Sequence, residues 1–298
     1  MNDLERQRKK LFGLAYRMTG SAADADDVVQ ETYLRATAQP PAPGNVEPWL
    51  VTVALNVARD RLRKRRRERY VGSWLPSPID VSELDAEPLS PDDRGTEARY
   101  SMLESVSFAF LLALEALTPL QRAVLLLRDV LDYSAKETAV AIGSTEGAVK
   151  VQLLRARRRI ASYEKTRITD SAATQETLVR FLGALRDADA NALESLLASD
   201  AVCKTDGGGE FIAAGIDLIG PKRIAAALLG ITKKTPPTLL LRFEVRALNG
   251  LPFFVAEQES PSPRIARHFA MACELDERGK IRAFYTVLAS RKLSALRL

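Results

Sequence analysis

Residues 134–163 read SAKETAVAIGSTEGAVKVQLLRARRRIASY, and this stretch predicts two helices joined by a tight turn. Ser134 followed by Glu137 is a capping-box pattern, which marks the start of the first helix. Gly143 supplies the turn, and the second helix follows from about Thr145. A helix, a short glycine-containing turn and a second helix with a basic tail are typical of a helix-turn-helix.

The second helix of this pair has two different faces when residues are placed 100° apart. The face expected to pack on the preceding helices is apolar and holds Val149, Leu153, Ala156 and Ile160. The opposite face mixes basic and apolar side chains: Lys150, Val151, Leu154, Arg155 and Arg158. In a DNA major groove, basic side chains hold phosphates or guanine edges, while apolar ones touch thymine methyl groups. We therefore expect this face to bind DNA.

The first 70 residues also read as helices. Ser21-Ala-Ala-Asp24 is a capping box, so a helix is expected to begin after Ser21. The proline- and glycine-containing stretch 39–46 breaks the chain into a loop. A second helix is expected from about Pro48. Another capping box with proline at the first helical position, Thr118-Pro-Leu-Gln121, predicts a helix in the stretch that precedes the helix-turn-helix.

The charge of the chain is unevenly distributed. Seven of the nine residues from Arg61 to Arg69 are basic, and a second basic cluster covers Arg155–Arg159. Between these clusters, Asp80–Glu97 holds seven acidic residues against the single Arg94. Two basic patches separated by an acidic, proline-containing linker suggest two nucleic-acid contacts made by one chain, although each patch alone could be a solvated face.

The C-terminal 125 residues, from about Thr174, change in character. Leu178, Phe181, Leu182 and Leu185 have the spacing of an amphipathic helix, and Pro221 opens another that ends near Gly230. Runs typical of strands follow at 239–248, 253–257, 265–275 and 281–288. Helices followed by antiparallel strands predict an α+β domain with a curved sheet wrapped around a helix.

The composition is that of a globular protein, with 46% hydrophobic and 27% charged residues among 298. No stretch approaches the roughly 20 apolar residues of a membrane helix, and the charged N-terminus has no apolar signal core. Cys203 and Cys273 are far apart in apolar contexts, and we expect core positions for both. These features predict a cytoplasmic protein with no membrane contact.

Four motifs resemble extracytoplasmic-function (ECF) sigma factors of the sigma-70 family. Residues 24–36 (DADDVVQETYLRA) resemble the polymerase-binding helix, and residues 49–63 (WLVTVALNVARDRLR) resemble the helix that recognises the melted minus-ten element. Residues 117–128 and 144–157 resemble the module that reads the minus-thirty-five element. The motifs occur in the expected order over about 165 residues. The resemblance implies binding to core RNA polymerase and promoter DNA, with no catalytic residues, no metal and no cofactor.

The resemblance extends to sigma factors that carry a fused SnoaL-like (NTF2-like) domain. Trp74-Leu-Pro-Ser-Pro78 resembles a linker motif of that subfamily, and Asp206-Gly-Gly-Gly209 resembles a glycine motif of the fused domain. Those relatives end in an asparagine-proline-aspartate motif, where this chain has Ala289-Ser-Arg-Lys-Leu293. The expected architecture is two all-α sigma domains, the second with a helix-turn-helix, followed by a cone-shaped α+β domain. The expected boundaries are 1–70 for sigma region 2, 71–99 for the linker, 100–165 for sigma region 4 and 174–298 for the SnoaL-like domain.

The resemblance assigns functional residues by motif. Those implied to face the polymerase are Asp24, Asp27, Gln30 and Glu31. Those expected at the minus-ten element are Asn56, Arg59, Asp60, Arg63 and Arg66. Those expected at the minus-thirty-five element are Glu146, Lys150, Val151, Leu154 and Arg155. A regulatory contact with the sigma domains or their linker is expected from Trp74, Leu75, Pro76, Asp206, Gly207, Gly208 and Gly209.

Two other classes of function stay open at this point. A ligand-sensing regulator of duplex DNA would explain residues 118–163 but would leave the first segment without a role. An enzyme joined to a DNA-binding module would need an acid or base in the C-terminal domain, where Asp206 and the single histidine, His268, are the candidates. A small-molecule ligand of that domain is also possible.

Overall fold

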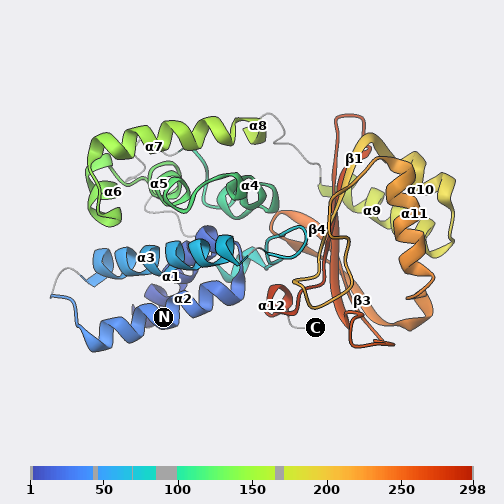
Figure 1. Ribbon diagram of the computed structural model, residues 1–298, viewed down its shortest axis with the longest axis horizontal. Coiled ribbons are helices and arrows are strands. Elements are labelled where there is room, and N and C mark those ends of the chain that lie inside the picture. Colours follow the sequence, from blue (N-terminus) through green and yellow to red (C-terminus); the bar gives the residue numbers. More distant parts are fainter. Residues whose placement is uncertain (1–2, 43–45, 69, 85–98, 165–170, 297–298) are drawn as a thin grey trace. The chain divides into compact units, whose positions relative to one another are not determined.

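The computed structural model describes residues 3–42, 46–68, 70–84, 99–164 and 171–296 (Figure 1). The chain divides into two compact units. Unit 1 comprises Met1–Arg69 and Asp80–Arg167, and unit 2 comprises Tyr70–Ile79 and Ile168–Leu298. Most of the acidic part of the predicted linker, 85–98, and part of the predicted proline-rich loop, 43–45, lie outside the described residues.

The first part of unit 1 is a group of three helices that pack on one another: α1 (Asp3–Thr19), α2 (Ala22–Ala38) and α3 (Val46–Arg67). The predicted start after Ser21 is confirmed, because the Ser21 hydroxyl accepts a hydrogen bond from the backbone N–H of Asp24 at 3.3 Å. The shared core is fully buried and contains Ala15, Tyr16, Val28, Leu55 and Ala58.

The second part of unit 1 is also helical. Its elements are η1 (Val81–Glu83), η3 (Glu104–Val106), α4 (Phe108–Ala113), η4 (Leu114–Ala116), α5 (Pro119–Asp129), α6 (Ala135–Ile142), α7 (Glu146–Arg159) and α8 (Ala161–Glu164). Both predicted capping boxes, at Thr118 and Ser134, are present with their reciprocal hydrogen bonds. Gly143 ends α6 with a φ of 65°, the left-handed conformation that glycine adopts without strain. The helix-turn-helix is therefore α6, this turn and α7.

Unit 2 begins, after the segment 70–79, with α9 (Ser171–Arg186) and α10 (Ala190–Leu196), and also contains α11 (Pro221–Thr232), η5 (Pro237–Leu239) and α12 (Ser290–Leu293). Its sheet has six strands in the order β2-β1-β6-β5-β4-β3. They are β1 (Leu197–Asp206), β2 (Leu218–Ile219), β3 (Leu240–Leu248), β4 (Leu251–Gln258), β5 (His268–Leu275) and β6 (Ile281–Val287). Figure 1 shows α9, α10 and α11 on one face of the sheet. The predicted α+β class is confirmed.

The prediction missed β1 and was wrong about a purely antiparallel sheet. β1 pairs with β6 in parallel, with Cys203 beside Phe284 and Asp206 beside Val287. The sequence of β1, LASDAVCKTD, mixes charged and apolar residues. Its composition therefore does not show that every second residue contacts the core. The parallel pairing arises because the last strand returns beside the first, a long-range contact that local patterns do not record.

The core between the sheet and the helices holds both cysteines. Cys203 and Cys273 are buried with Phe181, Phe254 and Phe284, as expected for small core residues. Burial raises the pKa of the Cys203 thiol to about 11 and that of the Cys273 thiol to about 12. Fewer than about one thiol in a thousand is therefore ionised at pH 8, and the thiolate is the reactive form.

We expect neither cysteine of the folded protein to react with an aromatic disulfide reagent at pH 8 over the minutes in which an exposed thiol reacts. Both should react at once after unfolding in guanidinium chloride, because desolvation is then lost. The released thiolate is measured by its absorbance. Rapid reaction of one equivalent in the native protein would contradict the buried position of that cysteine.

Candidate polymerase, promoter and linker contact sites

The four predicted polymerase-binding residues form two pairs on α2. Asp24 and Asp27 face α3, where the Arg61 guanidinium lies 3.9 Å and 3.0 Å from their carboxylates. Gln30 is exposed, and Glu31 is part-exposed with an ion pair of 2.9 Å to Arg35. The outer pair is therefore better placed to meet a partner than the inner pair.

An exposed leucine was missed by the sequence prediction. Leu34 has 66% of its surface exposed and lies one helical turn beyond Gln30 and Glu31 on α2. The sequence contained a signal for this position. Leu34 lies four residues after Gln30 and three after Glu31, and residues at that spacing share a helix face. A single exposed apolar side chain is ordinary on a protein surface, so it is the position of Leu34 beside Gln30 and Glu31 that makes it a candidate for the same contact.

The predicted minus-ten residues lie on α3, and two of them contact the second part of unit 1. Asn56, Asp60 and Arg63 are exposed, and the last two form an ion pair of 2.6 Å. Arg59 donates to the Ile142 carbonyl oxygen of α6 at 3.4 Å, and Arg66 donates to the Leu117 carbonyl oxygen. Partial burial lowers the pKa of the Arg59 guanidinium.

Buried arginines join the two parts of unit 1. Arg122 of α5, 2% exposed, donates to the Met18 carbonyl oxygen of α1 at 2.8 Å and to Glu115 at 2.6 Å. Arg65 of α3 forms a bidentate pair with the same Glu115 carboxylate at 2.7 and 2.8 Å. Arg17 of α1 reaches the Ser105 hydroxyl at 2.7 Å. Charge-assisted bonds of this kind are the stronger class of hydrogen bond.

The predicted DNA-reading face is formed by α7. The packing residues Val149, Leu153 and Ala156 are buried, as expected from the 100° spacing. The predicted contact residues are all exposed: Glu146, Lys150, Val151, Leu154 and Arg155. Arg157, a member of the basic cluster, instead faces inward and forms a bidentate pair with the buried Asp129 carboxylate at 2.6 and 2.9 Å. This pair holds α7 on α5.

Asp206 at the end of β1 binds the segment 70–79. Its carboxylate, fully buried, accepts hydrogen bonds from the Tyr70 hydroxyl at 2.5 Å and from the Leu75 backbone N–H at 2.8 Å. It also accepts one from the backbone N–H of Gly208 at 3.0 Å. A buried carboxylate needs such partners because its desolvation is costly. Asp206 therefore has a structural role at the linker.

Lys292 of α12 completes this site. Its ammonium group donates to the Leu75 carbonyl oxygen and lies 3.5 Å from the Asp206 carboxylate. It also lies 3.7 Å from the centre of the Trp74 ring, a cation–π contact, and 5.6 Å from that of Tyr70. We call these five residues the linker clamp. Sequence reasoning noted the altered C-terminal motif but missed the lysine within it.

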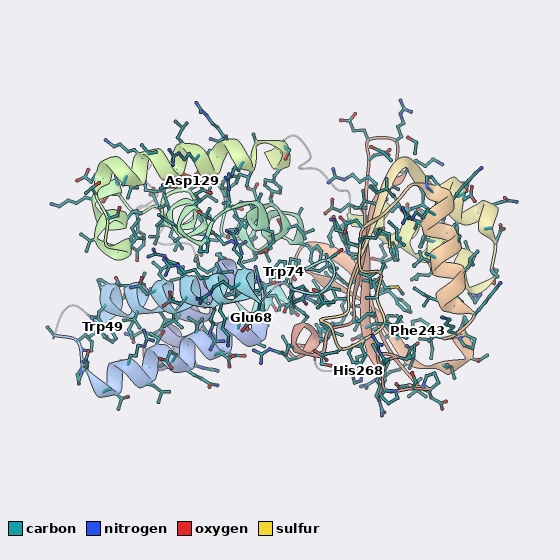
Figure 2. All side chains as sticks on the ribbon, viewed as in Figure 1. Trp49, Glu68, Trp74, Asp129, Phe243 and His268 are labelled. Carbon is teal, nitrogen blue, oxygen red and sulfur yellow. The ribbon has the colours of Figure 1, made fainter. Side chains whose placement is uncertain are left out.

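Two further contacts hold the segment 70–79 on unit 2. The Ser73 hydroxyl donates to Asp217 at 2.5 Å. At the other end, Ile79 and Asn249 exchange hydrogen bonds: the Ile79 N–H donates to the Asn249 side-chain oxygen at 2.8 Å, and the Asn249 N–H donates to the Ile79 carbonyl oxygen at 3.1 Å. Leu75 and Pro76 are buried. Figure 2 shows Trp74 on the side of the sheet away from α9–α11.

Steric contacts explain why glycine occupies the positions after Asp206. A Cβ atom on Gly207 would lie 2.7 Å from the Phe211 carbonyl oxygen, and one on Gly208 would lie 2.7 Å from the Ala289 Cβ atom. Gly208 and Gly209 also have φ values of 62° and 76°. The glycine motif is thus a tight loop, and it brings the chain after β1 close to Ala289, just before α12.

Comparison with known proteins decides the family. Sigma-70 region 2 matches residues 4–68, and sigma-70 region 4 matches residues 107–160. The curated ECF RNA polymerase sigma factor SigJ of Mycobacterium tuberculosis is 31% identical over 254 residues, 84% of this chain and 78% of that protein. This chain belongs to the ECF sigma factors.

One solved structure agrees with this assignment. The crystal structure of the M. tuberculosis extracytoplasmic function sigma factor SigJ is 27% identical, covers 99% of both chains and has a TM-score of 0.72. A putative isomerase of the SnoaL-like family from Agrobacterium tumefaciens, 15% identical, covers 40% of this chain and 99% of that one at a TM-score of 0.29.

As an ECF sigma factor, the protein directs transcription initiation and is not an enzyme. Sigma factors bind core RNA polymerase and promoter DNA. The first part of unit 1 is sigma region 2, and α4–α7 contain sigma region 4. Among the described residues, no group of His, Cys, Asp and Glu has the arrangement of a metal site, and no helix is long and apolar enough to cross a membrane.

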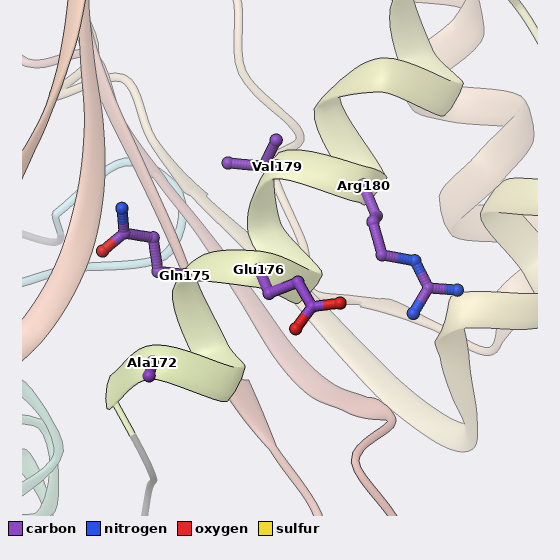
Figure 3. Close-up of a pocket in the computed structure, with 5 residues that line it drawn as sticks. All are labelled: Ala172, Gln175, Glu176, Val179 and Arg180. Carbon is purple, nitrogen blue, oxygen red and sulfur yellow. The ribbon is translucent and has the colours of Figure 1, made fainter.

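One hollow in unit 2 lies along α9. It has a volume of about 450 Å³ and is lined by Ala172, Gln175, Glu176, Val179 and Arg180 (Figure 3). All five described lining residues come from a single helix. Among the described residues, the hollow therefore lacks the convergent polar groups from several elements that hold a small ligand. The predicted small-molecule ligand stays a prediction.

Proposed function

We propose that unit 2 modulates this ECF sigma factor by holding residues 70–79, the start of the linker that connects the matched regions 2 (4–68) and 4 (107–160). The linker clamp carries the proposal. Tyr70, Trp74 and Leu75 belong to that linker, while Asp206 and Lys292 belong to the C-terminal domain. A contact within one chain has a high effective concentration, so a small surface is enough to control the linker.

The length of the free linker gives the clamp a physical effect. Ten extended residues span up to about 35 Å, so holding 70–79 on unit 2 removes that reach from the connection between the two sigma regions. The minus-ten and minus-thirty-five elements lie about 25 base pairs apart, or about 85 Å at 3.4 Å per base pair. Release of the linker clamp would free residues 70–79, so that sigma regions 2 and 4 could reach the two promoter elements more easily.

The packing within unit 1 supports the same proposal. Arg59 of α3 lies 3.4 Å from the Ile142 carbonyl oxygen of α6, and Glu115 joins Arg65 to Arg122. Two DNA-binding elements in direct contact cannot reach sites about 85 Å apart at the same time. Sigma regions 2 and 4 must therefore separate before both bind the promoter. We infer that the clamped linker favours the packed arrangement.

Run-off transcription with purified core polymerase tests the proposal. The template carries the upstream region of the protein's own gene, and the full chain is compared with versions that end near Lys165 and between Gly209 and Leu298. We expect versions that lack α12 but keep the sheet to initiate more than the full chain. Equal initiation by every version would contradict modulation by unit 2. Failure of all versions to bind core polymerase would contradict the sigma activity itself.

We propose that Gln30, Glu31 and Leu34 form the centre of the polymerase contact, with Asp24 and Asp27 at its edge. The resemblance to ECF sigma factors implies that these residues face a basic coiled coil on the polymerase. Replacing Glu31 with lysine is therefore expected to weaken binding to core polymerase by at least about tenfold, because like charges would then meet. Glu47→Lys, a charge reversal at the start of α3 where the side chain is 58% exposed against 41% for Glu31, is the control. Binding is measured by fluorescence anisotropy of the labelled sigma factor. Equal losses for both variants would place the contact elsewhere.

We propose that Lys150, Val151, Leu154 and Arg155 read the minus-thirty-five element, with Glu146 at its edge. Arg155→Ala is expected to weaken binding of the promoter by about 1–3 kcal/mol if the guanidinium reads a base edge. If it holds a phosphate, the loss of affinity should be the same for every DNA sequence. The slope of log K against log salt concentration should then fall by about one. Lys233→Ala, at the exposed C-cap of α11, serves as the control. An unchanged affinity and salt dependence would exclude Arg155 from the contact.

The residues proposed at the minus-ten element are Asn56, Arg59, Asp60, Arg63 and Arg66. A melted strand needs hydrogen bonds to its base edges and cations along its backbone, and α3 carries both kinds of group. Arg59 and Arg66 each donate a hydrogen bond to region 4 in this structure, and these bonds would be released when the regions separate.

A further inference from the structure

The strand β3 forms an open edge of the sheet in unit 2. It is the last strand in the order β2-β1-β6-β5-β4-β3, and β4 is its only strand partner among the described residues. Every residue from Leu241 to Val245 is exposed. An edge strand presents unpaired backbone N–H and C=O groups that can pair with another strand, and proteins usually protect such an edge.

The exposed side chains of β3 alternate between two kinds. Phe243 and Val245 stand beside Ala256 and Phe254 of β4, which belong to the core face of the sheet. Arg242 and Glu244 point to the opposite face. The apolar side chains are prominent: Leu241 is 53% exposed, Phe243 64% and Val245 37%. Figure 2 shows Phe243 at this edge, where its ring stacks on Phe254 at 5.3 Å.

We propose that two copies of this chain associate through β3, in antiparallel pairing centred on Phe243. In that register Arg242 of each copy lies opposite Glu244 of the other, so opposite charges meet twice on one face. These contacts extend the ion pairs that Arg242 forms with Glu257 and Glu244 with Arg246 within each chain. On the other face the two Phe243 rings meet at the two-fold axis, and Val245 of each copy lies toward Leu241, in the bulge of the other. Each exposed apolar side chain of the strand is then covered by another.

The two neighbouring registers of the β3–β3 pairing are less favourable, one because like charges would meet and the other because less apolar surface would be buried. Pairing centred on Glu244 would place Glu244 against Glu244 and Arg242 against Arg246, and like charges directly opposite are destabilising. Pairing centred on Val245 would leave Leu241 opposite Asn249, beyond the end of the strand. The bulge between Leu240 and Arg242 ends the regular edge, so the ladder is short. The dimer should therefore be weak and depend on concentration.

Cysteine cross-linking of the full chain tests the register. Phe243→Cys is expected to form a disulfide-linked dimer under mild oxidation, since the two Cβ atoms lie directly opposite. Leu241→Cys and Val245→Cys should link to each other when mixed, but each should link poorly alone. Ile216→Cys, at a site 62% exposed, controls for random collision. The native Cys203 and Cys273 are buried and should not contribute.

Sedimentation measures the dimer without a cross-link. The average mass of the native protein should rise from 32.8 kDa toward twice that value with concentration. Phe243→Lys should stay monomeric, because it buries a charge at the two-fold axis, whereas Ile216→Lys should behave as the native protein. Thermal unfolding checks that both variants fold. A native protein that stays monomeric throughout, or a Phe243→Cys variant that links no faster than Ile216→Cys, would overturn the proposal. Fastest self-linking by Val245→Cys or Glu244→Cys would overturn the register.

Discussion

Replacing Lys292 with methionine is expected to lower the free energy of unfolding of unit 2 by about 3 kcal/mol. The substitution keeps the length of the side chain but removes its charge. The Asp206 carboxylate, fully buried, then loses its ion pair, and the Leu75 carbonyl oxygen loses its donor. Removing one partner of a buried pair costs more than the pair itself contributes, because the other charge stays buried. Breaking a buried pair costs about 3–5 kcal/mol. The loss here should lie at the low end of that range, since three hydrogen bonds to Asp206 persist.

The same substitution should release the linker and raise promoter-directed initiation. Limited proteolysis within residues 70–79 should become faster, because Trp74 and Leu75 are no longer held. The measurements are denaturant unfolding, proteolysis and run-off transcription on one preparation. Arg291→Met, an exposed neighbour on α12, is the matched control.

A double-mutant cycle separates the clamp from a general loss of stability. Asp206→Asn combined with Lys292→Met removes both charges, so the double variant should lose less stability than the sum of the single variants. Strictly additive losses would show that Asp206 and Lys292 are not coupled and would contradict the clamp. Faster proteolysis without any change in initiation would show that the clamp holds the linker but does not control the sigma regions.

Replacing Glu115 with alanine is expected to cost unit 1 about 3–5 kcal/mol. Glu115 pairs with two arginines, Arg65 of region 2 and the buried Arg122 of region 4. Burial lowers the pKa of the Arg122 guanidinium, and Glu115 is the main group that opposes this shift. Without it, Arg122 stays buried with only carbonyl oxygens as acceptors, while Arg65 loses both of its bonds to the carboxylate.

Glu68→Ala provides the control for this prediction. Glu68 pairs with Lys64 at 3.6 Å, but both side chains are more than 60% exposed, and such pairs contribute about 0–1 kcal/mol. Denaturant unfolding should therefore separate the two variants clearly. A fluorescent pair with one label on α3 and one on α6 should also report a larger separation of regions 2 and 4 in the Glu115 variant. Equal stability and equal separation in both variants would contradict a joining role for Glu115.

The helical half of the fold was predictable because its signals are local. Ser21, Thr118 and Ser134 cap helix starts through hydrogen bonds to residues three positions later, so the signal lies within a few residues. The turn at Gly143 depends only on the φ angle that glycine allows. The apolar stripe of α7 likewise follows from the helix period alone. The strand β1 was missed because its pairing with β6 joins residues about 80 positions apart. No local pattern carries that information.

The candidate sites divide in the same way. From the sequence alone came the sigma motifs, their order, the exposed face of α7 and the two halves of the linker clamp in Trp74 and Asp206. Only the tertiary structure decided that Lys292 joins these halves, that Arg157 turns inward to Asp129, and that Arg65 and Arg122 share Glu115. A buried charge is stable only beside its partner, and that partner comes from a distant part of the chain, so its identity depends on how the elements pack.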